Sequence, residues 1–546
     1  MRKGKLSKGI ALLLASAMVM TGLSACGKDP VAEETTTAAA GETTAAAGSE
    51  AATTAADTEA GKETTFTYAI GGDPGANVNV ITTSDRFGLM TIKMVYSPLF
   101  MYNADGINWF LATGVDTSED NLTYTFHLRD DVKWSDGEPF TADDVVFTYE
   151  AMAETEGGWA YSQLVYPEGN VEIKKIDDTT VSFTFPFVNA SSVEMLSQIF
   201  IMPKHIYENV ADYENNEFNV KPVGTGPYIM SEYSAGSYVK FTKNENYFLG
   251  EPSIDTIIYR IIENSNTAML ALQSGEVNAW IGTPGEVQQM DLEANNLTVY
   301  PYTEGRVGYM EFNAKRVTDE RVRKAVLYAL NKKEINDACF LSEDNYEMPT
   351  GFMPTNSKFF TTEIETYEQD LEKSKALLEE AGVSNLKLTL GYNGADTVSS
   401  TQAVMMQEQL KKAGIELTLA SADGTALFNQ MKDPNNTYDM YLGGYIMGID
   451  PDTFASLFES GSISNTMHYD YPEINELFAK GRATTDEAER MKIYTELQGM
   501  IQDTGCFYPI TSNKRLLVMS SNVSGVEEAK LVPVYTFEDT SKLQMK

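Results

Sequence analysis

Histidine is scarce in this chain of 546 residues, which contains only His127, His205 and His468. None of the three falls in the His-Glu-x-x-His spacing of zinc hydrolases. His127 lies on the polar side of an alternating strand, where a solvated side chain is the simplest interpretation. No Gly-x-Ser-x-Gly nucleophile elbow occurs, and with 78 acidic residues a pair of carboxylates carries no information. We therefore expect no enzyme, no metal site and no cofactor.

Cysteine is equally scarce, and the position of the first one is informative. Cys26 closes the segment Leu23-Ser24-Ala25-Cys26, which resembles the lipobox of bacterial lipoproteins. A basic start and an apolar run at residues 10–20, too short to span a bilayer, precede it. We therefore predict that residues 1–25 are a cleaved signal peptide and that Cys26 is lipidated. An ordinary secretory signal with a chance cysteine stays open as the alternative.

The other two cysteines, Cys339 and Cys506, are compatible with a disulfide in an exported protein and equally with two buried free thiols. Long apolar runs are missing after the signal, so we expect no transmembrane helix. Large apolar residues are also missing from residues 27–65, which consist almost entirely of Thr, Ala, Glu and Gly. Such a segment cannot bury enough surface to fold, so we predict that residues 26–65 form a lipidated, disordered tether.

Basic residues are outnumbered by acidic ones. The 41 Lys and Arg residues stand against 78 Asp and Glu residues, for a formal net charge of −37. A surface this acidic repels phosphate backbones and anionic lipid headgroups. We therefore expect no nucleic-acid partner, and a membrane association that depends on the lipid anchor alone.

Residues 124–149, YTFHLRDDVKWSDGEPFTADDVVFTY, are the most informative segment. They predict an alternating strand, a turn at Trp134 to Gly137, and a helix for which Thr141 is the N-cap. Asp143 and Asp144 then lie in the first turn, where the helix dipole favours negative charge. This block closely resembles the one shared by family 5 extracellular solute-binding proteins, which are the oligopeptide, dipeptide and nickel receptors of ABC importers.

Further segments resemble the same family in the expected order along the chain. Val223 to Tyr228, VGTGPY, resembles the strand lead-in "P.GTGPY" of the family. A phosphate-binding loop is a poor interpretation there, because no third glycine and no Gly-Lys-Ser/Thr follow. Its two glycines instead predict a tight backbone crossing. The other matching segments are residues 94–106, 247–257, 268–280 and 319–326.

Periodicity predicts most of the remaining elements. We expect a hairpin at residues 171–185 around Asp177-Asp178, and a strand, helix and parallel strand at residues 386–391, 401–414 and 415–419. Gly382 is a natural C-cap for a helix that begins at Tyr367. The other expected strands are residues 66–70, 307–313, 438–445, 507–511 and 516–519, and the other expected helices are residues 474–480 and 487–501.

The resemblance implies an α/β protein with the two-lobed type II periplasmic-binding-protein fold, an extra inserted domain (cluster C) and a hinge between the lobes. The implied divisions are lobe I at residues 66–97, 223–306 and 512–546, its inserted domain at residues 98–222, and lobe II at residues 307–511.

The resemblance also implies a function. We expect a lipid-anchored, monomeric binding protein outside the cytoplasm, held at the outer face of the cell membrane or in the periplasmic space. It would close its lobes on a peptide and deliver it to two ABC permease subunits driven by ATPases. A non-peptide solute such as an oligosaccharide is the nearest alternative, and a surface lipoprotein with a sensory or chaperone role is the second. Nickel is disfavoured because no histidine matches a cleft segment.

The family's peptide receptors carry a segment Gly-Trp-x-x-Asp-x-x-Asp-Pro, whose first aspartate pairs with the α-ammonium of the peptide. Here the segment is residues 444–452, GYIMGIDPD, which is one residue shorter. The amine-binding position falls on Met447 or Gly448, neither of which is acidic. Either Asp450 has taken over the task or the ligand lacks a free amine.

Four further side chains complete the expected binding site. Tyr445 replaces the family tryptophan and would offer a flat face to the ligand or simply pack in the core. Trp280 and Tyr309 fall near the expected crossing between the lobes. Asn313 ends the segment after Tyr309 where peptide receptors make backbone contacts, and such receptors commonly hold the peptide main chain by strand-like hydrogen bonds.

Overall fold

The computed structural model describes residues 63–103, 105–156, 158, 160–446 and 448–546, all within one compact unit, Lys62–Lys546. The predicted signal peptide, lipidated Cys26, nearly all of the tether and Met447 lie outside the described residues. Among the described helices, none combines the length and the apolar character needed to cross a bilayer. Below, first lobe, inserted domain and second lobe denote the residue ranges given above.

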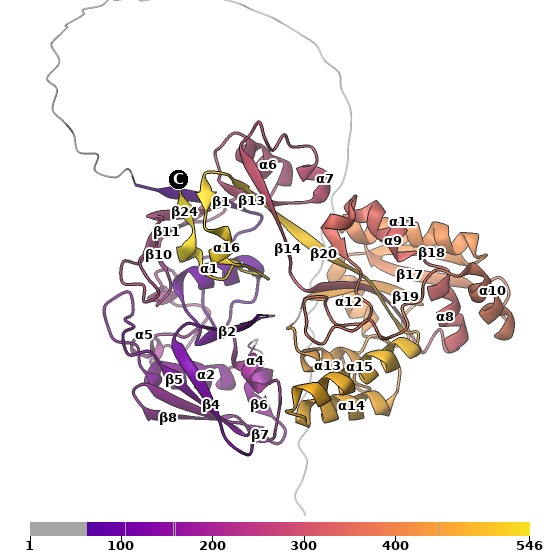
Figure 1. Ribbon diagram of the computed structural model, residues 1–546, viewed down its shortest axis with the longest axis horizontal. Coiled ribbons are helices and arrows are strands. Elements are labelled where there is room, and N and C mark those ends of the chain that lie inside the picture. The colour runs from indigo at the N-terminus through magenta and orange to yellow at the C-terminus, as the bar shows by residue number, and fades with distance from the viewer. Residues whose placement is uncertain (1–62, 104, 157, 159, 447) are drawn as a thin grey trace, which may run out of the picture. The chain divides into compact units, whose positions relative to one another are not determined.

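One mixed sheet of twelve strands runs through both lobes (Figure 1). Its main path is β10-β11-β12-β1-β13-β20-β15-β19-β17-β18, which confirms the expected α/β architecture. The first-lobe strands are β1 (Thr65–Ile70), β10 (Tyr228–Ser234), β11 (Tyr238–Lys243), β12 (Thr256–Ile261), β13 (Ala279–Gly282) and β14 (Leu297–Thr303). The second-lobe strands are β15 (Arg306–Phe312), β16 (Tyr346–Glu347), β17 (Lys387–Asn393), β18 (Glu416–Ala422) and β19 (Met440–Ile446).

A single long strand, β20 (Phe507–Ser520), joins the two lobes. Its first half pairs with β15, and its second half pairs with β13 and β14, one on each edge. In Figure 1, β14 and β20 run side by side between the elements of the two lobes. Two separate strands were expected here, at residues 507–511 and 516–519, and this was wrong. The intervening residues stay extended because Ser512 and Asn513 pair with β16, and Lys514 and Arg515 with β14.

The inserted domain contains a four-stranded antiparallel sheet in the order β4-β5-β9-β8. The hairpin of β8 and β9 confirms the prediction for residues 171–185. Thr141 caps α2 as predicted: its hydroxyl accepts from the Asp143 N–H, and the Asp144 carboxylate accepts from the Thr141 N–H at 2.9 Å. Its elements are β2 (Phe100–Asn103), β3 (Gly106–Trp109), β4 (Ala112–Thr117), β5 (Thr123–Leu128), α2 (Ala142–Glu154), α3 (Tyr161–Leu164), β6 (Val165–Tyr166), β7 (Gly169–Asn170), β8 (Glu172–Asp177), β9 (Thr180–Thr184), α4 (Ser192–Leu196) and α5 (Lys204–Tyr207).

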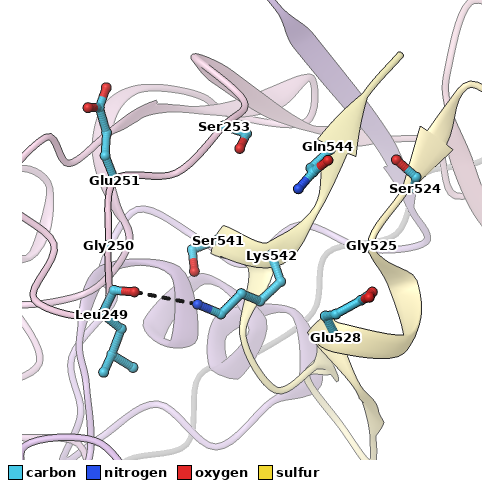
Figure 2. Close-up of a pocket in the computed structure, with 10 residues that line it drawn as sticks. All are labelled: Leu249, Gly250, Glu251, Ser253, Ser524, Gly525, Glu528, Ser541, Lys542 and Gln544. Atoms are coloured by element: carbon cyan, nitrogen blue, oxygen red, sulfur yellow. Dashed lines mark hydrogen bonds between the residues drawn. The ribbon is translucent and has the colours of Figure 1, made fainter.

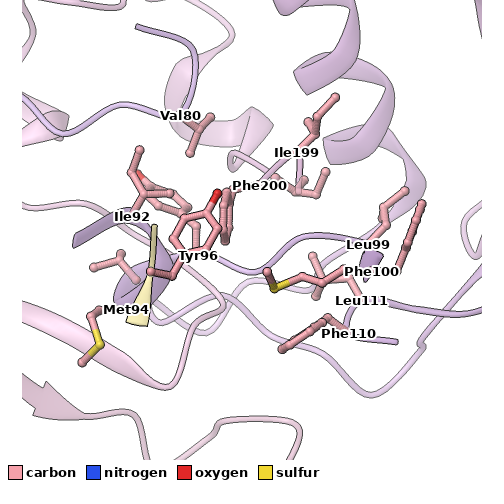
Figure 3. Close-up of a cluster of buried hydrophobic side chains, with 14 of the residues drawn as sticks. Val80, Ile92, Met94, Tyr96, Leu99, Phe100, Phe110, Leu111, Ile199 and Phe200 are labelled. Atoms are coloured by element: carbon pink, nitrogen blue, oxygen red, sulfur yellow. The ribbon is translucent and has the colours of Figure 1, made fainter. Parts of the chain in front are cut away.

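The hydrophobic core of the first lobe continues into the inserted domain. Figure 3 shows Ile92 and Met94 of α1 (Arg86–Val95) together with Phe100 and Phe110 of the inserted domain. All four side chains are at least 97 % buried. The expected boundary at residues 97/98 therefore falls inside a packed cluster, and the two parts share one core.

Gly224 and Gly226 permit a close backbone crossing, as predicted. A Cβ built on either residue would overlap backbone atoms of Val95, and the Gly226 N–H donates to the Val95 carbonyl at 2.7 Å. The crossing fixes the end of α1 against the strand lead-in of β10. Only glycine fits at these two positions.

Helices cover the sheet of the second lobe. The parallel pairing of β17 with β18 through α11 (Thr397–Lys412) confirms the predicted crossover. Helix α10 (Leu371–Glu380) begins later than expected because Asp370 caps it, and Tyr367 has a left-handed φ of 53°. The other second-lobe helices are α8 (Glu320–Tyr328), α9 (Lys332–Phe340), α12 (Gly424–Met431), α13 (Ala455–Phe458), α14 (Pro472–Ala483) and α15 (Glu487–Asp503). The remaining first-lobe elements are α6 (Ser265–Gln273), α7 (Pro284–Val287), β21 (Val523–Ser524), α16 (Val526–Ala529), β22 (Leu531–Val532), β23 (Thr536–Phe537) and β24 (Gln544–Met545).

Candidate functional site

A cavity of about 960 Å³ lies where the two lobes meet. The first lobe contributes the α7 segment, Gly282 to Glu286. The second lobe contributes β15, β19 and the N-terminal turn of α11, and the long strand β20 contributes residues 513–515. Because segments from both lobes form its walls, a change in the angle between the lobes would open or close it.

Arg306 lies on a platform made by two glycines. Gly308 of β15 is directly opposite Gly444 of β19. A Cβ on Gly444 would overlap the Arg306 guanidinium, and a Cβ on Gly308 would lie 3.2 Å from its Nη1. Because neither position has a side chain, the guanidinium lies against the strand backbones at the cavity wall.

The sequence did not single out Arg306. Its local signal is only a basic residue directly before a predicted strand. The significance of that residue becomes visible once β15 and β19 pair and bring Gly308 and Gly444 together. Register between distant strands is not readable from one sequence, so the platform could not be predicted.

Of the predicted ligand-binding residues, Tyr309 lines the cavity. Its ring packs against Tyr445 and Phe507, with centroids 5.5 and 5.0 Å apart. Burial, and then the charge of Glu311, raises the pKa of Tyr309, so the phenol stays neutral. A neutral phenol keeps its proton and can donate a hydrogen bond.

Tyr445 lies beside Tyr309 on the same face of the sheet. Its hydroxyl donates to the carbonyl of Phe352, and its ring packs on Phe454 with centroids 5.0 Å apart. Burial raises the pKa of Tyr445 well above its usual value. Since Tyr445 is absent from the described lining of the cavity, its contacts support the packing role rather than direct ligand contact.

Strand β19 presents an open backbone edge to the cavity. It pairs with β15 along its whole length, from Met440 to Ile446. On the other side, its described ladder with β17 covers only Met440 and Tyr441. Leu442, Gly443 and Gly444 line the cavity just beyond that short ladder. An unpaired strand edge inside a cavity offers N–H and C=O groups to an extended chain.

The lining carboxylates are already occupied by protein donors. Glu304 is 96 % buried and accepts from both Nη atoms of Arg86, at 2.6 and 2.9 Å. Glu286 accepts from the N–H and hydroxyl of Thr283 in a capping box. Asp396 caps α11 by accepting from backbone N–H groups at its start. Each of these carboxylates holds the wall of the cavity together.

Asp450 lies away from this cavity, in an ion pair with Arg490. Both side chains are more than 90 % buried, and both guanidinium Nη atoms donate to the carboxylate, one of them at 2.8 Å. Burial disfavours the charged guanidinium, but hydrogen bonding to Asp450 and the charge of that carboxylate outweigh it and raise the pKa of Arg490. The pair neutralises Asp450, so its geometry favours a structural role over the proposed capture of a ligand amine.

The remaining predicted residues are held in the protein interior or lie outside the described chain. Trp280 is 4 % exposed and packs with Ala69, Leu272 and Val518. Asn313 is fully buried; its amide donates to the Pro434 carbonyl at 3.2 Å, and its oxygen accepts from the Lys315 N–H. Neither residue is among the described lining of the cavity. Met447 is not among the described residues.

The two described cysteines are free thiols. Cys339 lines the cavity, and burial followed by the charge of Asp396 raises the pKa of its thiol to about 12. Cys506 is fully buried, and burial raises the pKa of its thiol to about 11. Both thiols therefore stay protonated and unreactive near neutral pH.

A second cavity, of about 460 Å³, lies within the first lobe (Figure 2). It is formed by the segment Leu249 to Ser253 and by the C-terminal segment. Lys542 reaches across it and donates to the Leu249 carbonyl at 3.4 Å. No second-lobe residue is among its described lining, so movement of the lobes would leave it unchanged.

Comparison with known proteins gives a consistent result. The model of the bacterial extracellular solute-binding proteins, family 5 Middle, matches residues 107–466. The crystal structure of the ABC transporter substrate-binding protein CtaP from Listeria monocytogenes is 36 % identical, with a TM-score of 0.85 over 88 % of this chain and 99 % of that one. A putative peptide-binding protein AppA from Clostridium difficile is 31 % identical, with a TM-score of 0.82 over 88 % of this chain and all of that one.

Curated relatives extend over a similar share of the chain. The oligopeptide-binding protein AppA of Bacillus subtilis is 27 % identical over 84 % of this chain and 88 % of its own length. Other relatives at 26 % and 25 % identity are named as a nickel-binding periplasmic protein and a heme-binding protein. The matches therefore agree on one fold and differ in the cargo they name.

Proposed function

The chain belongs to the bacterial extracellular solute-binding proteins of family 5, and from this we propose that it captures peptides outside the cytoplasm and delivers them to an ABC importer. Members of this family are non-enzymatic components of transporters. The protein binds its cargo between two lobes and passes it to two permease subunits driven by ATPases. It acts as a monomer.

The open edge of β19 is the observation that favours peptides over other cargo. Leu442, Gly443 and Gly444 border a cavity of about 960 Å³, and their ladder with β17 has ended at Tyr441. An extended peptide fits such an edge because its own N–H and C=O groups complete the ladder.

Other cargo finds less support in this cavity. Imidazole is the commonest metal ligand among protein side chains and suits nickel. None of His127, His205 and His468 is among the described lining of the cavity. Among the described residues, no cluster of three or more His, Cys, Asp or Glu is arranged to hold a metal ion. An oligosaccharide remains the second candidate because Tyr309 offers it an aromatic face.

Lipid on Cys26 would keep the protein at the membrane, and residues 27–65 would act as a tether. We expect the wild-type protein to fractionate with membranes and Cys26→Ser to appear in the soluble fraction. Radiolabelled palmitate should mark the wild type alone. Labelling of Cys26→Ser would contradict lipidation at this residue.

Identification of the bound cargo tests the peptide function. The protein is purified without denaturant, its cargo is released with acid, and the released molecules are identified by mass spectrometry. We expect short peptides close to one per protein molecule. A sample stripped of cargo and dialysed serves as the control and should release none. Release of a saccharide or a metal chelate in that amount, without peptides, would overturn the peptide assignment.

A further inference from the structure

Arg306 is the starting point, because its guanidinium lies at the cavity wall without an acceptor. No hydrogen bond or ion pair of its side chain occurs among the described residues. It rests against the glycine platform of Gly308 and Gly444, where side chains would otherwise displace it. A guanidinium carries five N–H donors in a rigid fork, so an unpaired one leaves much hydrogen-bonding capacity unused.

Two further cations in the lining are only loosely paired. The Lys514 ammonium is 4.0 Å from Glu347, which is beyond hydrogen-bonding distance. Nε of Arg515 is 3.2 Å from Glu304 but is not aligned for a hydrogen bond, and this buried atom has no partner among the described residues. Glu304 is instead held by Arg86. The hinge strands thus present positive charge to the cavity in a protein whose net charge is −37.

The acceptors of the cavity wall therefore have hydrogen-bond partners within the protein, whereas some of its described donors do not. The lining carboxylates Glu304, Glu286 and Asp396 all accept hydrogen bonds from the protein. The Arg306 guanidinium, by contrast, has no described acceptor for its N–H groups. A ligand that complements this wall must supply acceptors, and a carboxylate matches the guanidinium fork with two parallel hydrogen bonds.

We propose that Arg306 binds a carboxylate of the cargo, and that this contact makes the protein select acidic ligands. The proposal deepens the peptide-binding function and rests on it. The carboxylate can be the C-terminus of a peptide or the side chain of an aspartate or glutamate within it. In both cases the carboxylate lies against the Arg306 guanidinium, next to the open edge of β19 that holds the peptide main chain.

A competition between matched peptide libraries tests this inference. The full chain is stripped of cargo and offered three equimolar tetrapeptide libraries: neutral peptides with free C-termini, the same peptides as C-terminal amides, and amides that contain one glutamate. Retained peptides are counted by mass spectrometry. We expect either carboxylate-bearing library to be retained roughly ten- to a hundredfold over the neutral amides, the range for a charge-assisted hydrogen bond. The library that is enriched identifies the source of the carboxylate.

Substitutions then assign the preference to Arg306. We expect Arg306→Gln to retain peptides but to lose the preference for carboxylates. Arg321→Gln is the matched control, because it removes an exposed arginine that pairs with Asp319 and is not among the described lining of the cavity. The control should keep the full preference. The wild-type comparison needs no variant, so the inference stays testable even if Arg306→Gln folds poorly.

The possible outcomes separate this inference from the peptide function. Equal retention of acids and neutral amides by the wild type would overturn the carboxylate site and leave peptide binding intact. An unchanged preference in Arg306→Gln would overturn the assignment to Arg306. Failure to retain any peptide, acidic or neutral, would instead overturn the proposed function itself.

Discussion

Asp450 and Arg490 form an ion pair in which each side chain is more than 90 % buried. Nε of Arg490 also donates to the Gly481 carbonyl, which connects the pair to α14. Removing one partner of such a pair leaves an uncompensated buried charge. The pair therefore contributes to the stability of the second lobe whatever the cargo is.

Asp450→Ala should destabilise the protein rather than change its choice of ligand. We expect the free energy of unfolding to fall by about 3–5 kcal/mol, because the Arg490 charge would stay buried without a partner. Urea unfolding measures this loss. Asp131→Ala is the control, because the Asp131 side chain is 55 % exposed and forms a surface ion pair with Arg129. Loss of this pair should change the free energy of unfolding very little.

Ligand binding separates the two roles of Asp450 further. We expect Asp450→Ala to change the affinities for a peptide and for its N-acetylated form by the same factor, as measured by calorimetry. A selective loss of the free-amine peptide would restore the amine-binding role that the sequence suggested.

Single residues show how far the sequence could predict the site. Tyr309, expected near the crossing of the lobes, lines the cavity. Trp280 is expected at the same crossing, and Asn313 where peptide receptors of the family make backbone contacts, yet both side chains are buried in local packing. Alternation along a strand tells which side chains share a face, but it does not tell which face borders the cavity. That depends on strand pairing over long distances in the chain.

Strand β19 has one paired edge and one edge that is open over most of its length. Its residues 442–446 keep one ladder, with β15, and lack a described partner on the other edge. Successive residues of a peptide bound to this edge would direct their backbone N–H groups alternately toward β19 and away from it. Only every second amide of a bound peptide would therefore donate a hydrogen bond to β19.

N-methylation of peptide amides should reveal this alternation. We expect methylation at every second residue of a bound tetrapeptide to weaken binding roughly tenfold, because it removes hydrogen bonds to β19. Methylation at the intervening residues is the internal control and should have a much smaller effect. Calorimetry measures both series. Equal losses at all positions would argue against strand-like binding.

The sequence predicted those helices and strands that depend on residues close in the chain, and it failed where a strand depends on pairing with a distant segment. The N-cap Thr141, the β8–β9 hairpin and the β17–α11–β18 crossover each follow from residues close in the chain. The continuous strand β20 does not, because Ser512 and Asn513 read locally as a break between two apolar runs. They stay extended through pairing with β16, more than 160 residues away.

The inserted domain and the second lobe meet at a buried carboxyl group. Oε1 of Glu194 in α4 accepts from the N–H groups of Ile449 and Asp450, at 2.9 and 3.4 Å, and Oε2 has no partner among the described residues. A Cβ on Gly448 would overlap Glu194, so glycine permits this close approach. Burial, and then the charge of Asp450, raises the pKa of Glu194 above its ordinary value of 4.5, and the Arg490 charge offsets part of the effect.

This contact should make stability fall as pH rises. The folded protein holds the Glu194 proton more tightly than the unfolded chain, so the contribution is complete below about pH 4.5 and is lost as pH rises toward the elevated pKa. We expect urea unfolding between pH 5 and 8 to show a decline in unfolding free energy of at most about 1.4 kcal/mol per pH unit from this group, the limit for one proton. Glu194→Gln should remove that component, because an amide keeps the acceptor but cannot titrate. Identical pH profiles for the wild type and Glu194→Gln would show that the two parts of the protein meet without coupling to this proton.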